Sequence, residues 1–377
     1  MLLLLSPVAF SATVSTLAGS GSMGTTDGTG TSAVLRSPIS CVLTPDGSKL
    51  IFTQMQSVRQ MVVSSTAVST LAGSSSGENG YLDATGTSAR FHYPQGVAIT
   101  SNGATIYVAD DGNNRIRQLV LSSTEVTTLA GSGAAGSSDA VGQEATFNRP
   151  QGVTLSPDDT KLFVADYSNH AIRQIVVSTR AVTMLAGAGS AGYAEGTGSS
   201  ASFNYPVGLA MINAATLYVA DSDNHRIREI AVGTGAVTTL AGSGTASYAD
   251  GTGSSASFNR PWYMCLSPDG STMYLSEPGN DRLRQITISS GAVSTLAGDG
   301  TAAYQECARH APHERTGIRS RVCAPPSLTQ PSPPIASRGA TAALPPPLGS
   351  ITRRASQSPL TEATSSSQTL PTIAFVC

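Results

Sequence analysis

Four acidic side chains recur at one place in a repeating pattern and could together bind a cation. Asp110, Asp166 and Asp221 each end a Val-Ala-Asp run, and Glu277 stands at the matching place further along. Carboxylate oxygens are the ligands that Ca²⁺ prefers. Arranged around the mouth of a central channel, the four would form a calcium site. We favour a second interpretation, in which they accept hydrogen bonds from backbone groups in tight turns.

Two histidines form the other candidate metal pair. His170 and His225 occupy the same place in consecutive units, and imidazole is a common zinc ligand. Asn114 and Asp281 fill that place in the flanking units, which breaks the series. We therefore expect the two histidines to be structural, and no cluster in the chain indicates a nucleophile with a general base.

These side chains are spaced by a long repeat. Leu-Ala-Gly begins at six positions separated by 54 to 58 residues: Leu17, Leu71, Leu129, Leu185, Leu240 and Leu296. A period of this length, rich in Gly, Thr and Val, is typical of propeller blades. The sequence predicts an all-β fold, a β-propeller of four-stranded blades. Five blades are complete, Val14–Gly19 forms an orphan strand, and the six-bladed ring is incomplete in this chain.

One unit shows the predicted strands. After Phe91 and Pro94 come an apolar strand to Thr100, a second strand from Thr105 to Asp110, and two further strands that end at Gly131. The second strand is almost continuously apolar, as expected for a sheet covered on both faces. Four phenylalanines stand three residues before a proline, and we expect them to be packing wedges between blades: Phe91, Phe147, Phe203 and Phe258.

The repeated motif resembles the NHL-repeat family of β-propellers. Asn169-His170 and Asn224-His225 form the Asn-His pair, and Ile172-Arg173 and Ile227-Arg228 follow them. The resemblance covers about residues 14–299. It implies that Asn169, His170, Asn224 and His225 are structural signature residues. Similar propellers include an amidating lyase and lactonase-like enzymes, so a metal-dependent propeller hydrolase or lyase is the alternative function.

The turn after the second strand and the connection to the next blade should emerge at one end of the propeller. The connections repeat Tyr together with an acidic residue, and tyrosine gives contact area at a small entropic cost. The predicted binding-face residues are Tyr81, Asp83, Tyr193, Glu195, Tyr248 and Asp250. We expect a non-enzymatic scaffold without a cofactor that binds a protein or a glycan; calcium is the alternative cofactor.

Charge argues against one class of partner. Only 12% of residues are charged, and up to Asp299 there are 15 Lys and Arg against 21 Asp and Glu, a net charge of −6. Nucleic-acid binding needs a basic stripe that neutralises phosphates, and the repeats do not supply one.

The two ends of the sequence differ from the repeats. Residues 1–13 contain an apolar run that fits either a secretory signal peptide, and hence a secreted protein, or a truncated start; the run is too short for a transmembrane helix. The propeller is expected over residues 14–305. Residues 306–377, rich in Pro, Ser, Thr and Ala, are predicted to be a disordered tail.

Overall fold

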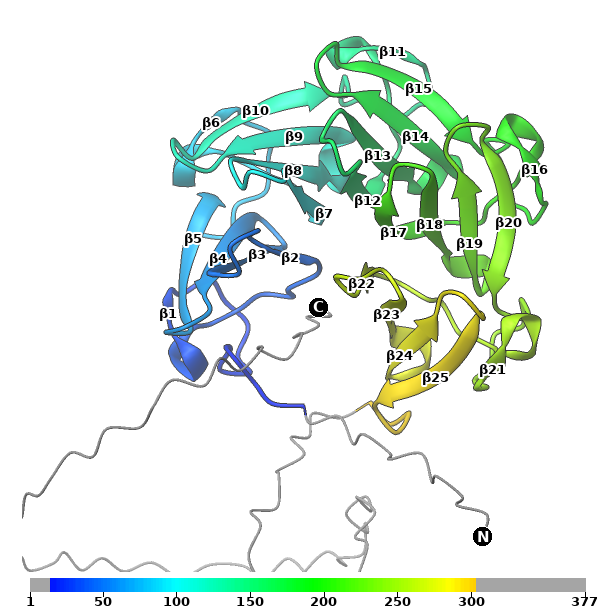
Figure 1. The fold of residues 1–377 in the computed structure, drawn as a ribbon. Coiled ribbons are helices and arrows are strands. Elements are labelled where there is room, and N and C mark those ends of the chain that lie inside the picture. Colours follow the sequence, from blue (N-terminus) through cyan, green and yellow to red (C-terminus); the bar gives the residue numbers. More distant parts are fainter. Residues whose placement is uncertain (1–13, 303–377) are drawn as a thin grey trace, which may run out of the picture. The chain divides into compact units, whose positions relative to one another are not determined.

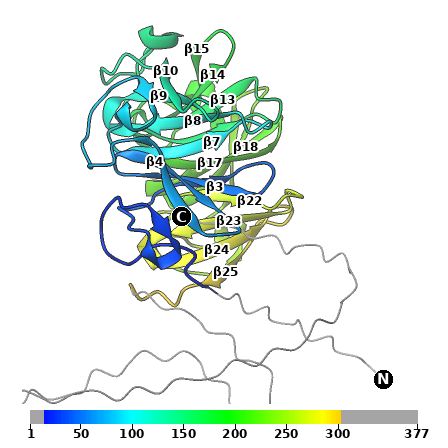
Figure 2. The same ribbon diagram turned by 90° about the vertical axis from the view of Figure 1, so that its left-hand side faces the viewer.

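The computed structural model describes residues 14–302, which form an all-β fold. In this part of the chain, the strands build five separate antiparallel sheets. Figure 1 shows that the sheets follow one another around a common centre, and Figure 2 shows the same arrangement from the side. The molecule is therefore a β-propeller, and each sheet is one blade, numbered 1 to 5 in chain order.

Each blade contains four main strands in meander order, each paired antiparallel with the next. The innermost strands are β2 (Cys41–Leu43), β7 (Pro94–Ile99), β12 (Pro150–Leu155), β17 (Pro206–Asn213) and β22 (Met264–Leu266). The second strands are β3 (Lys49–Gln54), β8 (Thr105–Asp110), β13 (Lys161–Asp166), β18 (Thr216–Asp221) and β23 (Thr272–Glu277). The third strands are β4 (Ser57–Val62), β9 (Arg115–Val120), β14 (Ala171–Val176), β19 (Arg226–Ala231) and β24 (Arg282–Thr287). The fourth strands are β5 (Ala67–Gly73), β10 (Glu125–Ala130), β15 (Ala181–Ala186), β20 (Ala236–Ala241) and β25 (Ala292–Ala297).

A fifth, two-residue strand corrects the prediction of four-stranded blades. It lies outside the fourth strand and comes from the connection that precedes the blade in sequence. These edge strands are β1 (Gly28–Thr29), β6 (Ala84–Thr85), β11 (Ala140–Val141), β16 (Gly196–Thr197) and β21 (Gly251–Thr252). The sequence does not predict these edge strands, because two residues are too few to show an alternating pattern.

Short 3₁₀ helices complete the connections. One set follows the edge strands: η1 (Gly30–Ser32), η2 (Gly86–Ser88), η4 (Gly142–Glu144), η6 (Gly198–Ser200) and η8 (Gly253–Ser255). The other set links the second and third strands of blades 2 to 5: η3 (Asp111–Asn113), η5 (Tyr167–Asn169), η7 (Ser222–Asn224) and η9 (Pro278–Asn280).

The predicted orphan strand is not a strand. Residues 14–19 have no β-pairing, although Gly19 N–H donates to Gly30 O at 3.1 Å. Gly131, Gly187 and Gly242, which follow the fourth strands of blades 2 to 4, make the same bond to Gly142, Gly198 and Gly253. The segment thus makes the hydrogen bond that follows a fourth strand in blades 2 to 4. No third strand is described beside it, so it has no strand to pair with.

The core lies between blades. Phe147 packs with Ile116 and Ala130 of blade 2, and Phe203 packs in the same way with Ile172 and Ala186 of blade 3. Phe91 and Phe258 fill the two other junctions, and all four rings are fully buried. The predicted wedges are confirmed.

Glycine allows the innermost strands to approach each other closely. A Cβ on Gly152 would lie 2.0 Å from Val207 O of blade 4, and one on Gly96 would lie 2.4 Å from Gln151 O of blade 3. Any other residue at these places would push neighbouring blades apart.

In residues 14–302, no helix has the length and hydropathy needed to cross a membrane. The predicted signal peptide or truncated start, residues 1–13, lies outside the described residues. So do the predicted tail, residues 306–377, and the last residues predicted for the propeller, 303–305.

Candidate functional site

The second-to-third-strand turns meet the inter-blade connections at one end of the propeller. The Asn113 side chain donates to Gly80 O at 2.8 Å, and Asn169 donates to Gly136 O at 2.7 Å. Asn224 and Asn280 make the same contact in blades 4 and 5. The predicted shared end of turns and connections is therefore confirmed.

The asparagine of the Asn-His pair holds this turn together. The Asn169 and Asn224 side chains also donate to Asp166 and Asp221, each at 2.8 Å. The following histidines, His170 and His225, adopt left-handed backbone with φ of 52° and 54°.

The histidines connect one blade to the next. His170 Nδ1 accepts the backbone N–H of Tyr205 at 3.1 Å, and His225 Nδ1 accepts that of Arg260 at 3.1 Å. Burial lowers the pKa of both imidazoles, which favours the neutral form that can accept a hydrogen bond. In blade 2, Asn114 Oδ1 takes this role. The contacts support the structural interpretation of the histidines.

The three residues whose backbone N–H groups donate these bonds belong to a rim of five residues that the sequence analysis missed. Each stands directly before the proline of its blade and has left-handed backbone, with φ between 46° and 56°: Ser37, Tyr93, Arg149, Tyr205 and Arg260. We call these five the pre-proline rim. Left-handed backbone costs a non-glycine residue roughly 1–2 kcal/mol. The sequence does contain a signal for this rim: in blades 2 to 5 a tyrosine or an arginine stands directly before the proline.

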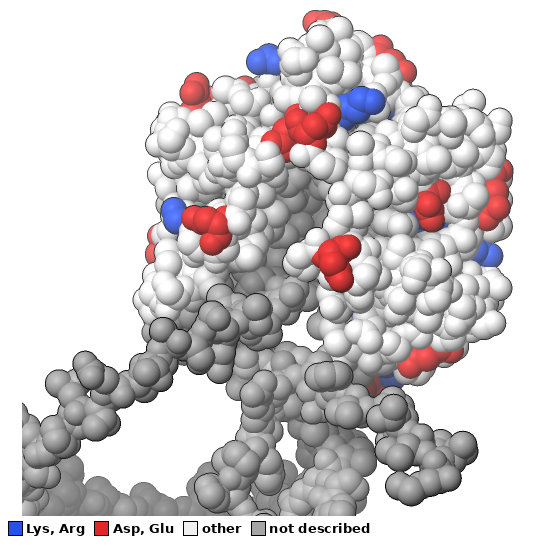
Figure 3. Space-filling model, viewed as in Figure 1, with Lys and Arg blue, Asp and Glu red and all other residues white. Residues whose placement is uncertain are grey.

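The two rim arginines point outward in fixed orientations. Arg149 Nε and Nη2 bond both carboxylate oxygens of Asp111 at 3.0 and 3.2 Å, and Arg260 Nε lies 3.0 Å from Asp223 Oδ1. Arg149 is 57% exposed and Asp111 only 2%, so the surface presents the cation. Elsewhere charges form small, separated patches on the face that Figure 3 shows.

Aromatic rings lie beside the arginines. Tyr205 packs against Tyr167 at 4.6 Å and against His170 at 4.5 Å between ring centroids. The Arg149 guanidinium lies 5.7 Å from the Tyr167 ring. Tyr93, on the neighbouring blade, is 37% exposed. The rim therefore combines aromatic surface with oriented guanidinium groups.

The four candidate calcium ligands lie inside the blades, each against an arginine of the third strand. Asp110 pairs with Arg117 at 2.7 Å and Asp166 with Arg173 at 3.0 Å, all with fully buried side chains. Asp221 and Glu277 pair with Arg228 and Arg284 at 2.8 and 2.6 Å. Residues 14–302 contain no group of three or more His, Cys, Asp or Glu placed to hold a metal ion. Calcium binding at the four residues stays a prediction.

Burial sets the acidity of these carboxyl groups. It raises the pKa of Asp166 and of Asp221 from 3.8 to about 6, against the opposing hydrogen bonds from backbone, asparagine and arginine. At neutral pH both are therefore ionised partners of a buried guanidinium.

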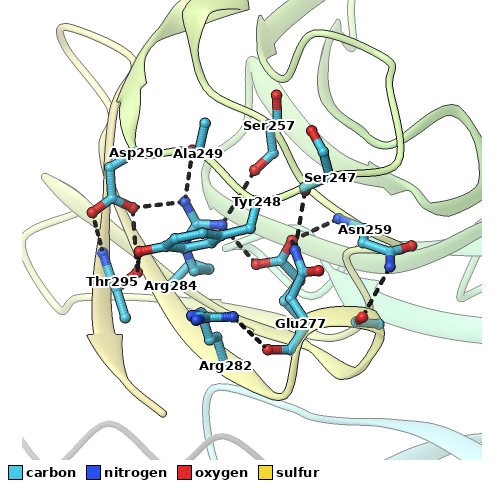
Figure 4. A network of polar contacts seen from close by, with 12 residues as sticks. Ser247, Tyr248, Ala249, Asp250, Ser257, Asn259, Glu277, Arg282, Arg284 and Thr295 are labelled. Carbon is cyan, nitrogen blue, oxygen red and sulfur yellow. Dashed lines mark hydrogen bonds and ion pairs between the residues drawn. The ribbon is translucent and has the colours of Figure 1, made fainter. Parts of the chain in front are cut away.

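The predicted binding-face residues lie at the outer edge, and two of their acidic groups pair with the same arginines. Asp250 accepts from Arg284 at 2.8 Å, as Figure 4 shows, and Asp83 pairs with Arg117. Glu195 Oε1 accepts the N–H of Thr239 at 3.0 Å. These acidic groups are engaged within their own blades.

The three tyrosines of this set have one covered and one accessible side. Their rings lie 3.8 to 3.9 Å from the guanidinium carbons of Arg115, Arg226 and Arg282, and they are 41 to 46% exposed: Tyr81, Tyr193 and Tyr248. Their hydroxyls lie within hydrogen-bonding distance of threonines on the fourth strands. Whether any of the six residues binds a partner stays a prediction.

The repeats match a known family. A sequence model described as the NHL repeat matches residues 91–119, 147–175 and 203–230, the start of blades 2 to 4 through their third strands. The chain is an NHL-repeat β-propeller. The resemblance of the Asn-His motif is thereby confirmed, and in this chain the motif works as the junction described above.

Two curated relatives are similar to this chain, and one of them is named for the NHL repeat. Human NHL repeat-containing protein 2 is 27% identical over 308 residues, 74% of this chain and 42% of the relative. The Arabidopsis thaliana protein SUPPRESSOR OF QUENCHING 1, chloroplastic, is 25% identical over 290 residues, 59% of this chain and 27% of the relative. The NHL-repeat chain thus matches less than half of each relative's length.

Two solved structures are similar to this chain over most of its length. A nidogen/laminin complex is 13% identical, with a TM-score of 0.49, and the match covers 68% of this chain and 79% of that one. An auxiliary nutrient binding protein from Bacteroides thetaiotaomicron is 16% identical, also with a TM-score of 0.49, over 75% and 76%. The propeller assignment itself comes from the strand pairing.

Proposed function

We propose that this NHL-repeat propeller is a non-enzymatic scaffold that binds a protein partner through the pre-proline rim. The observation that carries the proposal is the presentation of Tyr93, Arg149, Tyr205 and Arg260 at one end, on backbone that costs free energy to hold. Strained backbone of this kind concentrates at functional sites. Tyrosine and arginine are also the residue types that most often dominate binding energy at protein interfaces.

Rigidity favours the same role. In blades 2 to 5 the rim backbone N–H is held by the preceding blade, and the two arginines are held by carboxylates, so little side-chain entropy remains to be lost on binding. The predicted binding-face tyrosines lie further out at the same end and would extend the contact.

Partner capture with rim variants tests the proposal. Immobilised wild-type chain is compared with Arg149→Ala plus Tyr205→Ala, and with Arg180→Ala as control, because Arg180 is an exposed arginine with φ of 60° in a third-to-fourth-strand turn. We expect saturable capture that the rim variant reduces at least tenfold and the control leaves unchanged. Equal capture by all three would contradict the proposal, and capture of glycans alone would replace the protein partner by a glycan.

We also propose that the ring has six blade positions. The support is the segment 14–19, whose Gly19–Gly30 bond matches the one that follows a fourth strand in blades 2 to 4. An experimental structure with blades 1 and 5 in direct core contact would contradict this proposal.

A further inference from the structure

We propose that the partner binds the rim with an acidic peptide segment, whose carboxylates pair with Arg149 and Arg260 on either side of two tyrosines. We call Arg149, Tyr167, Tyr205 and Arg260 the rim arc. The inference rests on the proposed function and deepens it, because it names the chemistry of the partner and the groups that recognise it.

The four side chains of the rim arc follow one another over blades 3 to 5. The Arg149 guanidinium lies 5.7 Å from the Tyr167 ring, and that ring packs against Tyr205 at 4.6 Å between centroids. Burial and the Asp223 carboxylate raise the pKa of the Tyr167 hydroxyl, and Arg149 and Arg260 both oppose this rise. Both guanidinium groups therefore act on the same phenol, and the tyrosine pair lies between two cations.

The charge that the rim arc exposes is positive, although each arginine has a carboxylate partner. The side chains of Arg149 and Arg260 are 57% and 61% exposed, whereas those of Asp111 and Asp223 are 2% and 25% exposed. The carboxylates fix the guanidinium groups in place but are themselves largely hidden. An approaching partner therefore meets the cations first, and a carboxylate is the group that pairs most strongly with an exposed guanidinium.

Each guanidinium keeps donors for a second carboxylate. Arg149 uses Nε and Nη2 for Asp111, and its Nη1 makes no hydrogen bond within residues 14–302. Arg260 faces Asp223 through Nε, and its two Nη atoms make no hydrogen bond within the same range. A guanidinium has five N–H donors in a planar fork, so one edge can hold the protein's own carboxylate while another receives the partner's.

Three other arginines at this end of the propeller do not offer the same donors. Arg115, Arg226 and Arg282 each donate through both Nη atoms to backbone carbonyls, and each stacks on a tyrosine ring. The rim positions of blades 1 and 2 are uncharged, because Ser37 and Tyr93 stand there. The exposed cations of the rim are therefore those of blades 3 and 5.

The charge of the repeats favours an acidic peptide over a nucleic acid. Up to Asp299 there are 15 Lys and Arg against 21 Asp and Glu, so a long polyanion would be repelled outside the rim arc. A short acidic segment needs only the arc. Binding of acidic motifs by clustered arginines is an established mode of peptide recognition, and the two tyrosines supply contact area for the rest of the segment.

A pair of peptides tests the proposal with the full chain. The probe is a fluorescently labelled peptide of three Glu-Gly-Glu-Phe repeats, and its control has glutamine in place of every glutamate. In fluorescence anisotropy we expect saturable binding of the probe and at least tenfold weaker binding of the control. Probe binding should also weaken from 0.1 M to 1 M NaCl, because the Debye length falls from about 10 Å to about 3 Å. Equal affinity for the two peptides would overturn the proposal.

Protein variants locate the binding. Arg149→Gln plus Arg260→Gln should weaken probe binding at least tenfold, whereas Arg180→Gln, at an exposed arginine in a third-to-fourth-strand turn, should not. Circular dichroism checks folding, since Arg149→Gln leaves the buried Asp111 without its cation. If the double variant does not fold, Arg260→Gln alone replaces it, because Asp223 is accessible to water, and should weaken binding at least threefold. Equal affinity in all folded variants would contradict the proposal.

Two further outcomes separate this inference from its alternatives. A labelled single-stranded oligouridine should bind more weakly than the probe, and tighter binding that the glutamine variant abolishes would replace the acidic peptide by a nucleic acid. In the partner-capture experiment, Arg149→Gln plus Arg260→Gln should reduce capture. Capture that Arg149→Ala plus Tyr205→Ala reduces, but the glutamine variant does not, would overturn acidic recognition and leave the proposed function standing.

Discussion

Blade 3 and blade 1 use the same buried arginine with different partners. Arg173 of blade 3 is fully buried, and its Nη1 donates to Asp166 and to Thr146 O. Arg59 of blade 1 is equally buried, but Gln54 stands where the aspartate would be, and Arg59 Nη1 has no hydrogen-bond partner among residues 14–302. Burial without the second carboxylate lowers the pKa of Arg59, although Asp27 opposes the change.

The difference extends to the junctions of the two blades. Phe147 of blade 3 is fully buried between two blades, whereas Leu35 of blade 1 is only half-buried, in a cluster of blade 1 residues and Ala18 of the segment 14–19. Blade 3, which has a described blade on both sides, therefore has the full set of polar and apolar contacts of the repeat. On the incoming side of blade 1 the structure describes only the segment 14–19, and here Gln54 and Leu35 stand in place of the aspartate and the phenylalanine.

Removal of the carboxylate in blade 3 should have the largest effect. Asp166→Ala leaves Arg173 buried with Asp139 as its one remaining described carboxylate partner, and should lower the free energy of unfolding by about 3–5 kcal/mol. Gln54→Ala in blade 1 should cost less than half as much, because Arg59 Nη1 makes no described hydrogen bond that the substitution could remove. Urea denaturation at pH 7.5 measures both; equal losses would contradict the comparison.

The wedge should separate the two blades almost as clearly. Phe147→Ala empties a fully buried site and should cost about 3–5 kcal/mol. Leu35→Ala should cost below about 2 kcal/mol because the side chain is only half-buried and leaves a smaller cavity. Thermal unfolding followed by circular dichroism ranks the two variants, and a larger loss for Leu35→Ala would show that blade 1 has another neighbour.

Blade 3 should also respond to pH. The pKa of Asp166 is raised to about 6, so the folded state holds this proton more tightly than the unfolded chain. The contribution of this group to stability is therefore complete below about pH 4 and is lost as pH rises through 6, at most about 3 kcal/mol for two pKa units. Urea denaturation between pH 4 and 7.5 should show a flatter profile for Asp166→Asn than for wild type. Parallel profiles would place the pKa near its ordinary value.

The junction histidine should have a smaller effect. His170→Ala removes the acceptor of the Tyr205 N–H and should cost about 1–2 kcal/mol. Asp281→Ala is the matched control in blade 5, because its side chain accepts no described hydrogen bond. It should leave the denaturation midpoint unchanged, and a comparable loss would mean that Asp281 already has a partner.

The smallest expected change is a gain. Gln54→Glu is isosteric and gives Arg59 Nη1 the partner that Glu277 provides to Arg284 at 2.6 Å in blade 5. We expect an increase of about 1 kcal/mol in the free energy of unfolding at pH 7.5, measured with urea. A decrease would show that the existing bond from Gln54 to Ser57 matters more than the new ion pair.

Sequence reasoning could predict the contacts within one turn of the site, but it missed the hydrogen bonds that join neighbouring blades. Asn169 and Asp166 lie three residues apart in one turn, so their contact followed from local chemistry. The partner of His170 lies 35 residues away, at Tyr205, and no local pattern reveals it. The exposure of Arg149 depends in the same way on Asp111, which belongs to the preceding blade.

The sequence alone determined the period, the main strands, the phenylalanine wedges and the family, because each depends on spacing that backbone geometry makes regular. Only the tertiary structure decided which carboxylates face arginines and which rim side chains face solvent. Those outcomes depend on the neighbouring blade. A repeated sequence cannot show which of its copies has a neighbour, because burial belongs to the assembled sheets and not to the motif.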